Sequence, residues 1–179
     1  MTASFPTTVK SFTAVTDGVD YPEAVDINSL QEETAAVETY LLTSPSAARV
    51  THSTTQSIAN STFQALTFDT ETFDTDTMHS AGTNPTRLTA ITAGKYVVTA
   101  CAAFASNATG ARIAALRLNG SQLNQQRISA VNGYETMIVL SDIYNLAAND
   151  YVEVFVFQDS GAALNVISAS TSLAMCRMR

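Results

Sequence analysis

The chain has few of the residue types on which enzymes and metalloproteins depend. Its 179 residues include only two cysteines, two histidines and seven glycines, and no tryptophan. The sequence has no Gly-x-Ser-x-Gly elbow, no glycine-rich phosphate loop and no Cys-x-x-Cys pair. These absences predict a protein that is not an enzyme and that needs no cofactor.

Cationic side chains are also scarce. Nine lysines and arginines stand against sixteen acids, which gives a net charge of −7. Nucleic-acid binding depends on clustered lysine and arginine, so a nucleic-acid partner is not expected. No apolar run approaches the roughly 18 residues of a membrane span, and the N-terminus has no apolar stretch behind a basic start. We therefore expect neither a membrane partner nor a secretory signal.

The negative charge is concentrated near the N-terminus. Residues 1–46 contain seven acids and the single cation Lys10, so they carry −6 of the total charge, and residues 47–179 are close to neutral. Residues 1–19 are rich in threonine and serine and have only isolated apolar anchors, a composition that cannot close a core. The split predicts an attachment arm with a short helix over residues 1–46 and a separate body over residues 47–179.

The second half of this arm has helical spacing. Asp20 and Asp26 are alternative capping residues for its start, and Ser44-Pro45 ends it. The apolar positions step by three and four residues, which is the spacing of a coiled-coil seam. A helix packed on its own domain remains the other interpretation, because the seam is short. The seam consists of Ile27, Leu30, Thr34, Val37 and Leu41.

Beyond residue 47 the apolar period changes from helical to two. In 95–105, one face carries Tyr96, Val98, Ala100, Ala102 and Phe104, and the other carries smaller side chains, which is typical of a central strand. Asn119-Gly120 and Asn132-Gly133 each predict a hairpin. Further alternating runs cover 112–118, 135–144, 151–158 and 164–178. The pattern predicts an all-β protein, an antiparallel jelly-roll sandwich preceded by the arm and helix.

The segment 151–157 is apolar on both faces. A strand of a two-layer sandwich normally exposes one face to water, so a further surface should cover the second face. Subunit contact is the simplest candidate. Together with the helical seam, this favours a homotrimer whose contacts include Tyr151, Phe155 and Phe157.

Two groups of residues have alternative interpretations. Cys101 and Cys176 lie in apolar alternating segments and are expected to be buried thiols, with a disulfide between them as the alternative. The acidic stretch 69–76 could place Asp74 and Asp76 on one side of an extended segment, where they are weak candidates for a hard cation such as calcium. The other interpretation of this stretch is a solvated loop.

Several motifs of the body resemble the complement globular-head and tumour-necrosis-factor-like family of trimeric jelly rolls. They are Leu66-Thr67-Phe68-Asp69, Phe73-Asp74, Leu88 and Gly94-Lys95-Tyr96, with Val98 and Ala100 at alternate positions beyond. The chain departs from the family pattern at Leu88, Val98 and Ala100, where larger aromatics are usual. The resemblance covers about residues 60–179 and implies a trimeric jelly roll.

The arm resembles a different group, the N-terminal segments of tailed-bacteriophage structural proteins that carry a jelly roll on a short helix. The matching residues are 11–13, 16–20, 24–28 and 30–31, including Phe12, Asp17 and Asp20. This resemblance implies a virion protein made in the bacterial cytoplasm.

Two functional hypotheses follow. The first is a trimeric capsid decoration or cement protein whose arm docks on the major capsid protein through Phe5, Phe12, Val15, Asp17, Asp20 and Tyr21. The second is a tail or head fibre whose jelly roll binds a host surface glycan, with Asn107, Asn124, Gln125, Gln126 and Tyr134 as candidate contacts.

Overall fold

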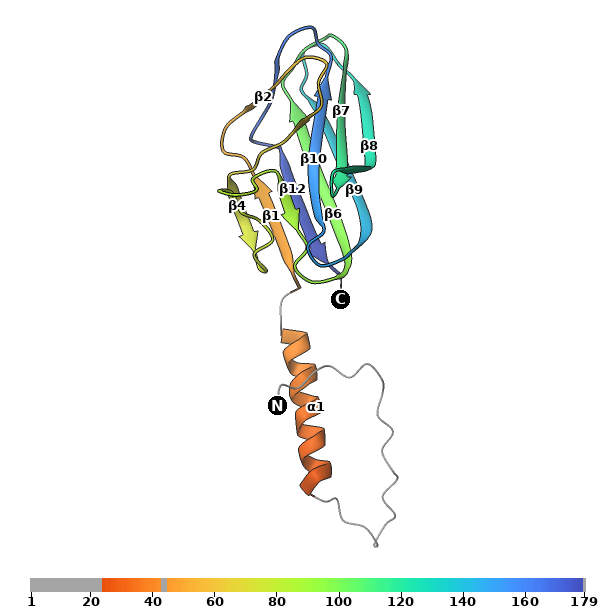
Figure 1. Ribbon diagram of the computed structural model, residues 1–179. Coiled ribbons are helices and arrows are strands. Elements are labelled where there is room, and N and C mark those ends of the chain that lie inside the picture. Colours follow the sequence, from red (N-terminus) through yellow and green to blue (C-terminus); the bar gives the residue numbers. More distant parts are fainter. Residues whose placement is uncertain (1–23, 43–44, 179) are drawn as a thin grey trace. The chain divides into compact units, whose positions relative to one another are not determined.

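The computed structural model describes residues 24–42 and 45–178, and the chain divides into two units between Ser44 and Pro45 (Figure 1). The first unit contains the helix α1 (Ala24–Leu42). Glutamate and alanine, which are strong helix formers, recur within α1, and the helix ends before Pro45. A helix is therefore present where the seam predicted one, and the attachment role of this unit stays a prediction.

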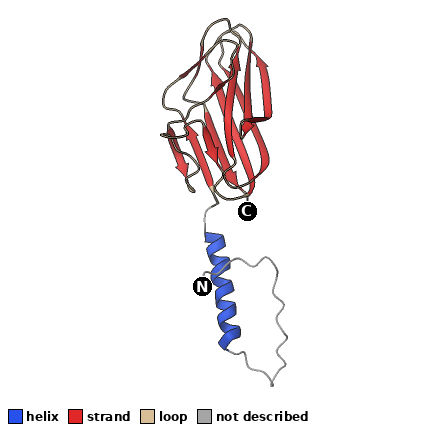
Figure 2. Ribbon diagram, viewed as in Figure 1, coloured by secondary structure: helices blue, strands red, loops and turns tan. Residues whose placement is uncertain are grey.

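The second unit consists of strands (Figure 2). They are β1 (Ala47–Thr51), β2 (Gln56–Ile58), β3 (Gln64–Ala65), β4 (Thr70–Asp74), β5 (Arg87–Thr89), β6 (Gly94–Phe104), β7 (Ala111–Leu118), β8 (Ser121–Ser129), β9 (Thr136–Leu146), β10 (Tyr151–Gln158), β11 (Leu164–Val166) and β12 (Ser172–Arg177).

Within residues 45–178, these strands form two antiparallel sheets around one core (Figure 1). The sheet that we call the β6 sheet has the order β2-β11-β6-β12-β1-β4, and β9 also pairs with β6. The sheet that we call the β10 sheet has the order β3-β10-β7-β8, and β5 also pairs with β10. The predicted antiparallel sandwich is confirmed.

The core lies between the facing sides of β6 and β10. Tyr96, Val98 and Phe104 of β6 are fully buried, as are Val152 and Val154 of β10. Burying side chains of this size stabilises a fold by about 1.5–3 kcal/mol each. The Tyr96 hydroxyl is satisfied in the interior because it donates to the Thr92 carbonyl oxygen at 2.6 Å. The face of 95–105 that carries the larger side chains is the buried one.

Two strand connections test the turn predictions. Asn119 and Gly120 have φ of 49° and 80° and join the paired strands β7 and β8, so the first predicted hairpin is confirmed. The hairpin predicted at Asn132-Gly133 is wrong. Here only Gly133 has positive φ, and the segment leads from β8 in one sheet to β9 in the other. The predicted run 164–178 is likewise two strands, β11 and β12.

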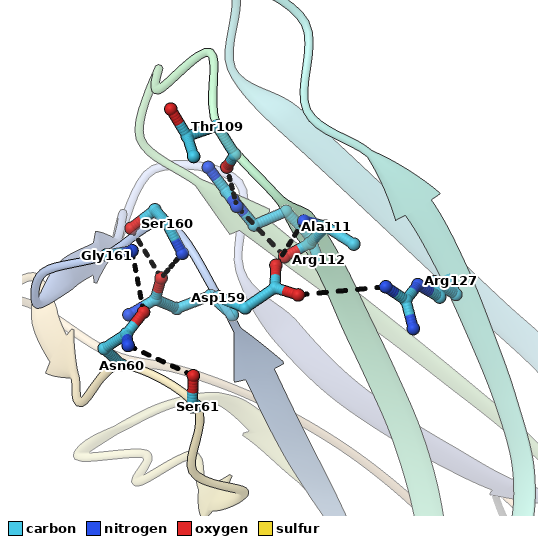
Figure 3. A network of polar contacts seen from close by, with 10 residues as sticks. Asn60, Ser61, Thr109, Ala111, Arg112, Arg127, Asp159, Ser160 and Gly161 are labelled. Atoms are coloured by element: carbon cyan, nitrogen blue, oxygen red, sulfur yellow. Dashed lines mark hydrogen bonds and ion pairs between the residues drawn. The ribbon is translucent and has the colours of Figure 1, made fainter.

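A buried arginine organises one end of the sandwich (Figure 3). Arg112 lies opposite Gln158 in the β7–β10 ladder, on the side that faces the core, and its side chain has no exposed surface. Its guanidinium donates to the backbone carbonyls of Thr109 and Ala111, both at 3.0 Å, and of Asn107 at 3.2 Å. Burial lowers the pKa of Arg112, and the charge of Asp159 opposes that shift. The guanidinium therefore fixes the loop between β6 and β7.

Further contacts fasten the neighbouring loops to this end. The Asp159 carboxylate accepts a hydrogen bond from the Ala111 amide, and Gly110 approaches Asp159 so closely that a Cβ atom would overlap its backbone. The buried amide of Gln158 donates to the carbonyls of Ile58 and Ala162 at 3.0 and 2.8 Å. We call the loops 105–110, 130–135 and 159–163 at this end the apical loops.

We predict that Arg112→Met lowers the free energy of unfolding by about 3 kcal/mol, because it leaves the backbone carbonyls of Asn107, Thr109 and Ala111 without the buried guanidinium that donates to them. Arg127→Gln is the matched control, since the Arg127 side chain is 64% exposed and lies 3.8 Å from Asp159. It should change stability by less than about 1 kcal/mol. Urea unfolding at equal protein concentration measures the free energy of unfolding of both variants. Equal unfolding midpoints for the two variants would contradict the role of Arg112.

Candidate functional site

The outward side of the β6 sheet is apolar at its centre. Because paired residues point to the same side of a sheet, Val139 of β9, Cys101 of β6 and Ser172 of β12 form one row, and Ile143, Val97 and Cys176 form another. We call this surface the β6 face. Its members are Val97, Thr99, Cys101, Met137, Val139, Ser141, Ile143, Ser172, Ala174 and Cys176.

The ten residues of the β6 face are uncharged, and Arg49 and Lys95 border it on the same side of the sheet. The face is open in the single chain. Met137 is 47% exposed, and Val139 and Ile143 are each 53% exposed. The hydroxyls of Thr99 and Ser141 lie 3.1 Å apart and satisfy each other. From strand spacings, the face extends about 24 Å along β9 and about 14 Å across three strands. A mostly apolar surface of this size is often an interaction site of a folded protein.

The outward side of the β10 sheet is also apolar, but its own chain covers it. The Arg117 guanidinium lies 3.7 Å from the ring centroid of Phe155, and the Arg87 guanidinium lies 4.4 Å from that of Tyr151. Phe157 stacks on Phe63 with ring centroids 5.1 Å apart. The surface expected to cover the second face of β10 is therefore supplied within the chain. The assignment of Tyr151, Phe155 and Phe157 to subunit contact stays a prediction. The need for a covering surface no longer supports it, because the chain itself supplies that surface.

The sequence also carries a signal for the β6 face, in the segment that forms β9. In β9, Met137 and Val139 alternate with Ile138 and Leu140, so this strand too is apolar on both sides. Ile138 and Leu140 are buried in the core, and Met137 and Val139 point outward. Both sheets therefore contain a strand that is apolar on its two faces. Only the contacts in the structure show that the outward face is covered at β10 and open at β9.

The described positions of the helical seam are also exposed. Leu30 is 49% exposed and Val37 is 39% exposed, and Thr34 between them is exposed as well. The Thr34 hydroxyl donates to the Leu30 carbonyl at 2.8 Å, so it needs no further partner in an apolar seam. The side chains of Ile27 and Leu41 lie outside the described residues, as do the predicted docking residues of the arm, Phe5, Phe12, Val15, Asp17, Asp20 and Tyr21. Among the described residues, no helix has the length and apolar character to cross a membrane.

Both cysteines lie on the β6 face with free thiols. Cys101 is partly buried, and this burial raises the pKa of its thiol. Cys176 is exposed, so the prediction that both thiols lie in the core is wrong for Cys176. The reason is that each faces away from the core side of its strand, at a position that nothing in the described chain covers completely.

The acidic stretch forms the exposed strand β4 and the bend after it. Both oxygens of Asp74 accept backbone hydrogen bonds, from the amides of Asp76 at 3.1 Å and His79 at 2.9 Å. The buried His79 ring contacts Glu71, with Nδ1 and Oε1 2.9 Å apart. Because β4 ends at Asp74, Asp74 and Asp76 do not share a side of one strand. The described residues contain no group of three or more potential metal ligands.

The candidate glycan contacts lie apart from one another. Asn107 is in an apical loop, where its side chain accepts from the Thr109 amide at 2.8 Å. Tyr134 is 71% exposed in the connection from β8 to β9. On β8, Gln125 pairs opposite Ala115 and points outward, whereas Asn124 and Gln126 alternate to the other side. The structure therefore does not gather these five residues into one site.

The pattern Gly94-Lys95-Tyr96 has a physical explanation in this fold. Tyr96 enters the core, and a Cβ atom at Gly94 would lie 2.7 Å from Nε of Arg177, so the glycine leaves room for that side chain. The Arg177 Nε donates to the Ala93 carbonyl at 3.2 Å and connects the end of β12 to the start of β6. The residues that carry the family resemblance thus lie where the two central strands meet.

Comparisons with known proteins show the fold. No family model matches the chain, and no curated protein matches it. Two crystal structures of murine APRIL match, one at pH 8.0 with a TM-score of 0.58, 14% identity and coverage of 74% of this chain and 98% of that chain. The other, at pH 5.0, has a TM-score of 0.56, 12% identity and coverage of 75% and 99%.

The globular domain of zebrafish complement 1qA protein also matches, with a TM-score of 0.56, 13% identity and coverage of 75% of this chain and 98% of that chain. At these identities the likeness concerns the fold alone. The chain is an antiparallel jelly roll of the kind found in APRIL and in the complement globular domain, as its sequence predicted.

Proposed function

We propose that the protein is a homotrimeric structural protein of a tailed-bacteriophage particle, a decoration or cement protein that binds the outside of the capsid through its N-terminal arm. The observation that carries the self-association is the uncharged, half-exposed β6 face, on which Val139 and Ile143 are each 53% exposed. On the outward side of the β10 sheet, arginines of the same chain lie over the rings of Tyr151 and Phe155.

Burial of the β6 face against like subunits would supply the stabilisation. Each exposed Val, Ile or Met removed from water contributes about 1 kcal/mol or more, at about 25 cal/mol per Å² of apolar surface. A ring of three requires each subunit to offer two different surfaces, one for each neighbour. The edge formed by β8 and β9, beside the β6 face, is available as the second surface. The number three comes from the sequence resemblance to trimeric jelly rolls and from the helical seam.

The virion role is supported by the arm. Its residues resemble the attachment segments of phage structural proteins, and residues 1–46 carry −6 of the net charge, which complements a basic protein surface. A trimer that binds only the assembled capsid lattice adds its binding free energy to the closed shell, so it stabilises the shell by mass action. Trimers also match the three-fold positions of such a lattice.

One observation favours the fibre as the second candidate. Val131 and Tyr134 are 54% and 71% exposed within the same apical loop, a solvent-facing apolar pair that a receptor or glycan would cover. The copy number per particle separates the candidates: hundreds of copies indicate decoration, and a few to a few tens indicate a fibre.

We predict that Val139→Asp converts the trimer to a monomer, because it places a carboxylate in the centre of the buried β6 face. Light scattering should give three times the 19.0 kDa chain mass for the native protein and the single chain mass for the variant. A thiol reagent should modify Cys176 slowly in the native protein and rapidly in the variant. Val131→Asp, at a valine of matching exposure outside the face, is the control. A native protein that is monomeric at micromolar concentration would contradict the proposal.

We predict that Leu30→Asp/Val37→Asp weakens trimerisation and reduces the helical circular-dichroism signal, because an isolated helix of this length is marginal in water. The thermal unfolding temperature of the body should be unchanged when variant and native protein are compared at the same fraction of trimer. Gln31→Asp, one position outside the seam, is the control. If both variants reduce the helical signal equally, α1 does not depend on its seam.

We predict that a chain starting at Ser46 folds but no longer binds particles that lack the native protein. The deletion removes the arm and keeps every strand of the described body. Cosedimentation with such particles measures binding, and cryo-electron microscopy of particles with the full chain locates it on the shell or the tail. Undiminished binding by the shortened chain would place the docking surface on the jelly roll instead of the arm.

A further inference from the structure

The outward side of the β10 sheet holds two arginines over aromatic rings. We call this surface the β10 face and define it by Phe63, Arg87, Arg117, Tyr151, Phe155 and Phe157. Arg117 lies 3.7 Å from the Phe155 centroid and 5.7 Å from that of Phe63, and Arg87 lies 4.4 Å from that of Tyr151. Stacking restricts both guanidinium groups before any ligand binds, so less conformational entropy is lost on binding.

Among the described residues, no carboxylate forms an ion pair with either guanidinium. In the register of the sheet, Glu153 lies directly opposite Arg87 on one side and Arg117 on the other. Its carboxylate instead accepts a hydrogen bond from the Thr86 hydroxyl at 2.6 Å. Among the described residues, the ion pairs are His79 with Glu71 and Arg127 with Asp159. The two arginines of the β10 face thus retain donors for an external anion.

The geometry selects the form of that anion. Arg87 lies over Tyr151 and Arg117 lies over Phe155, and these two ring positions are about 13 Å apart along β10. While both guanidinium groups stay on their rings, a single phosphate or carboxylate cannot contact both. A chain with repeated carboxylates can contact both, and guanidinium groups bind carboxylates with charge-assisted hydrogen bonds.

The neighbouring side chains favour a sugar chain over an acidic peptide. Phe63 is 38% exposed beside Arg117, which offers an aromatic surface to a sugar ring, and Gln125 points outward from the adjacent strand β8. A peptide binds most simply by adding a strand to a free sheet edge. Arg117 lies on β7, which is already hydrogen-bonded to β8 and β10.

We propose that the β10 face binds an acidic polysaccharide, with Arg87 and Arg117 contacting its carboxylates and Phe63 contacting a sugar ring. This activity goes beyond capsid decoration, and it does not require the trimer because all of these residues belong to one chain. The chain carries −7 overall, so the attraction is short-range and declines as salt screens it.

The experiment measures binding of labelled oligogalacturonate to the full chain by fluorescence anisotropy at low ionic strength. Two further probes are the methyl-esterified oligosaccharide, which keeps the sugars and removes the charge, and poly-glutamate of the same charge. We expect the acidic oligosaccharide to bind and both other probes to bind at least about tenfold more weakly, a difference of about 1.4 kcal/mol. Equal binding of the methyl ester, or equal or tighter binding of poly-glutamate, would overturn the proposal.

The variants locate the site. Arg87→Gln and Arg117→Gln should each weaken oligogalacturonate binding about tenfold. Lys95→Gln, which removes the same charge from an exposed position on the other sheet, should have little effect. If Arg117→Gln unfolds because Phe155 loses its cover, Arg117→Lys replaces it. Lysine keeps the positive charge but lacks the planar guanidinium group that binds a carboxylate through two hydrogen bonds. The Val139→Asp variant should bind as the native chain does, so loss of the trimer and loss of this site are separable. Binding unchanged in all arginine variants would refute the assignment.

Discussion

The register of β6 between β9 and β12 is the constraint on which the other features depend. In this register Tyr96, Val98 and Ala100 meet the core, and Val97, Thr99 and Cys101 point outward. A shift of one residue would exchange the two sets and bury the wrong face. The same pairing aligns Val139 and Ile143 with the outward side chains of β6. The core and the proposed subunit surface are therefore two results of one hydrogen-bonded ladder.

The two outward faces of the sandwich show different ways to accommodate apolar strands. On the β10 face, arginines from sequence-distant strands cover the aromatic rings. On the β6 face, Val139 and Ile143 are each left 53% exposed. One sheet is thus completed by its own chain, and we infer that like subunits complete the other.

Local chemistry explains which predictions succeeded. The strands 95–105 and 151–158 alternate strongly, and Asn119-Gly120 meets the positive φ of its turn with residues that tolerate it, so neighbouring residues determine these features. Asn132-Gly133 has the same composition, but its strands enter different sheets, and long-range packing decides that. The cover of Phe155 by Arg117 comes from a strand more than thirty positions away, and the burial of Arg112 reflects its place in a ladder. No local pattern contains either fact.

Arg112 has a consequence for how the apical end responds to its surroundings. Its guanidinium occupies a place among backbone carbonyls and near Asp159 where a dissolved cation would otherwise be suited. A charge attached to the backbone cannot be washed out, chelated or exchanged. The loop after β6 is therefore held by a charge of the chain itself and not by a bound ion.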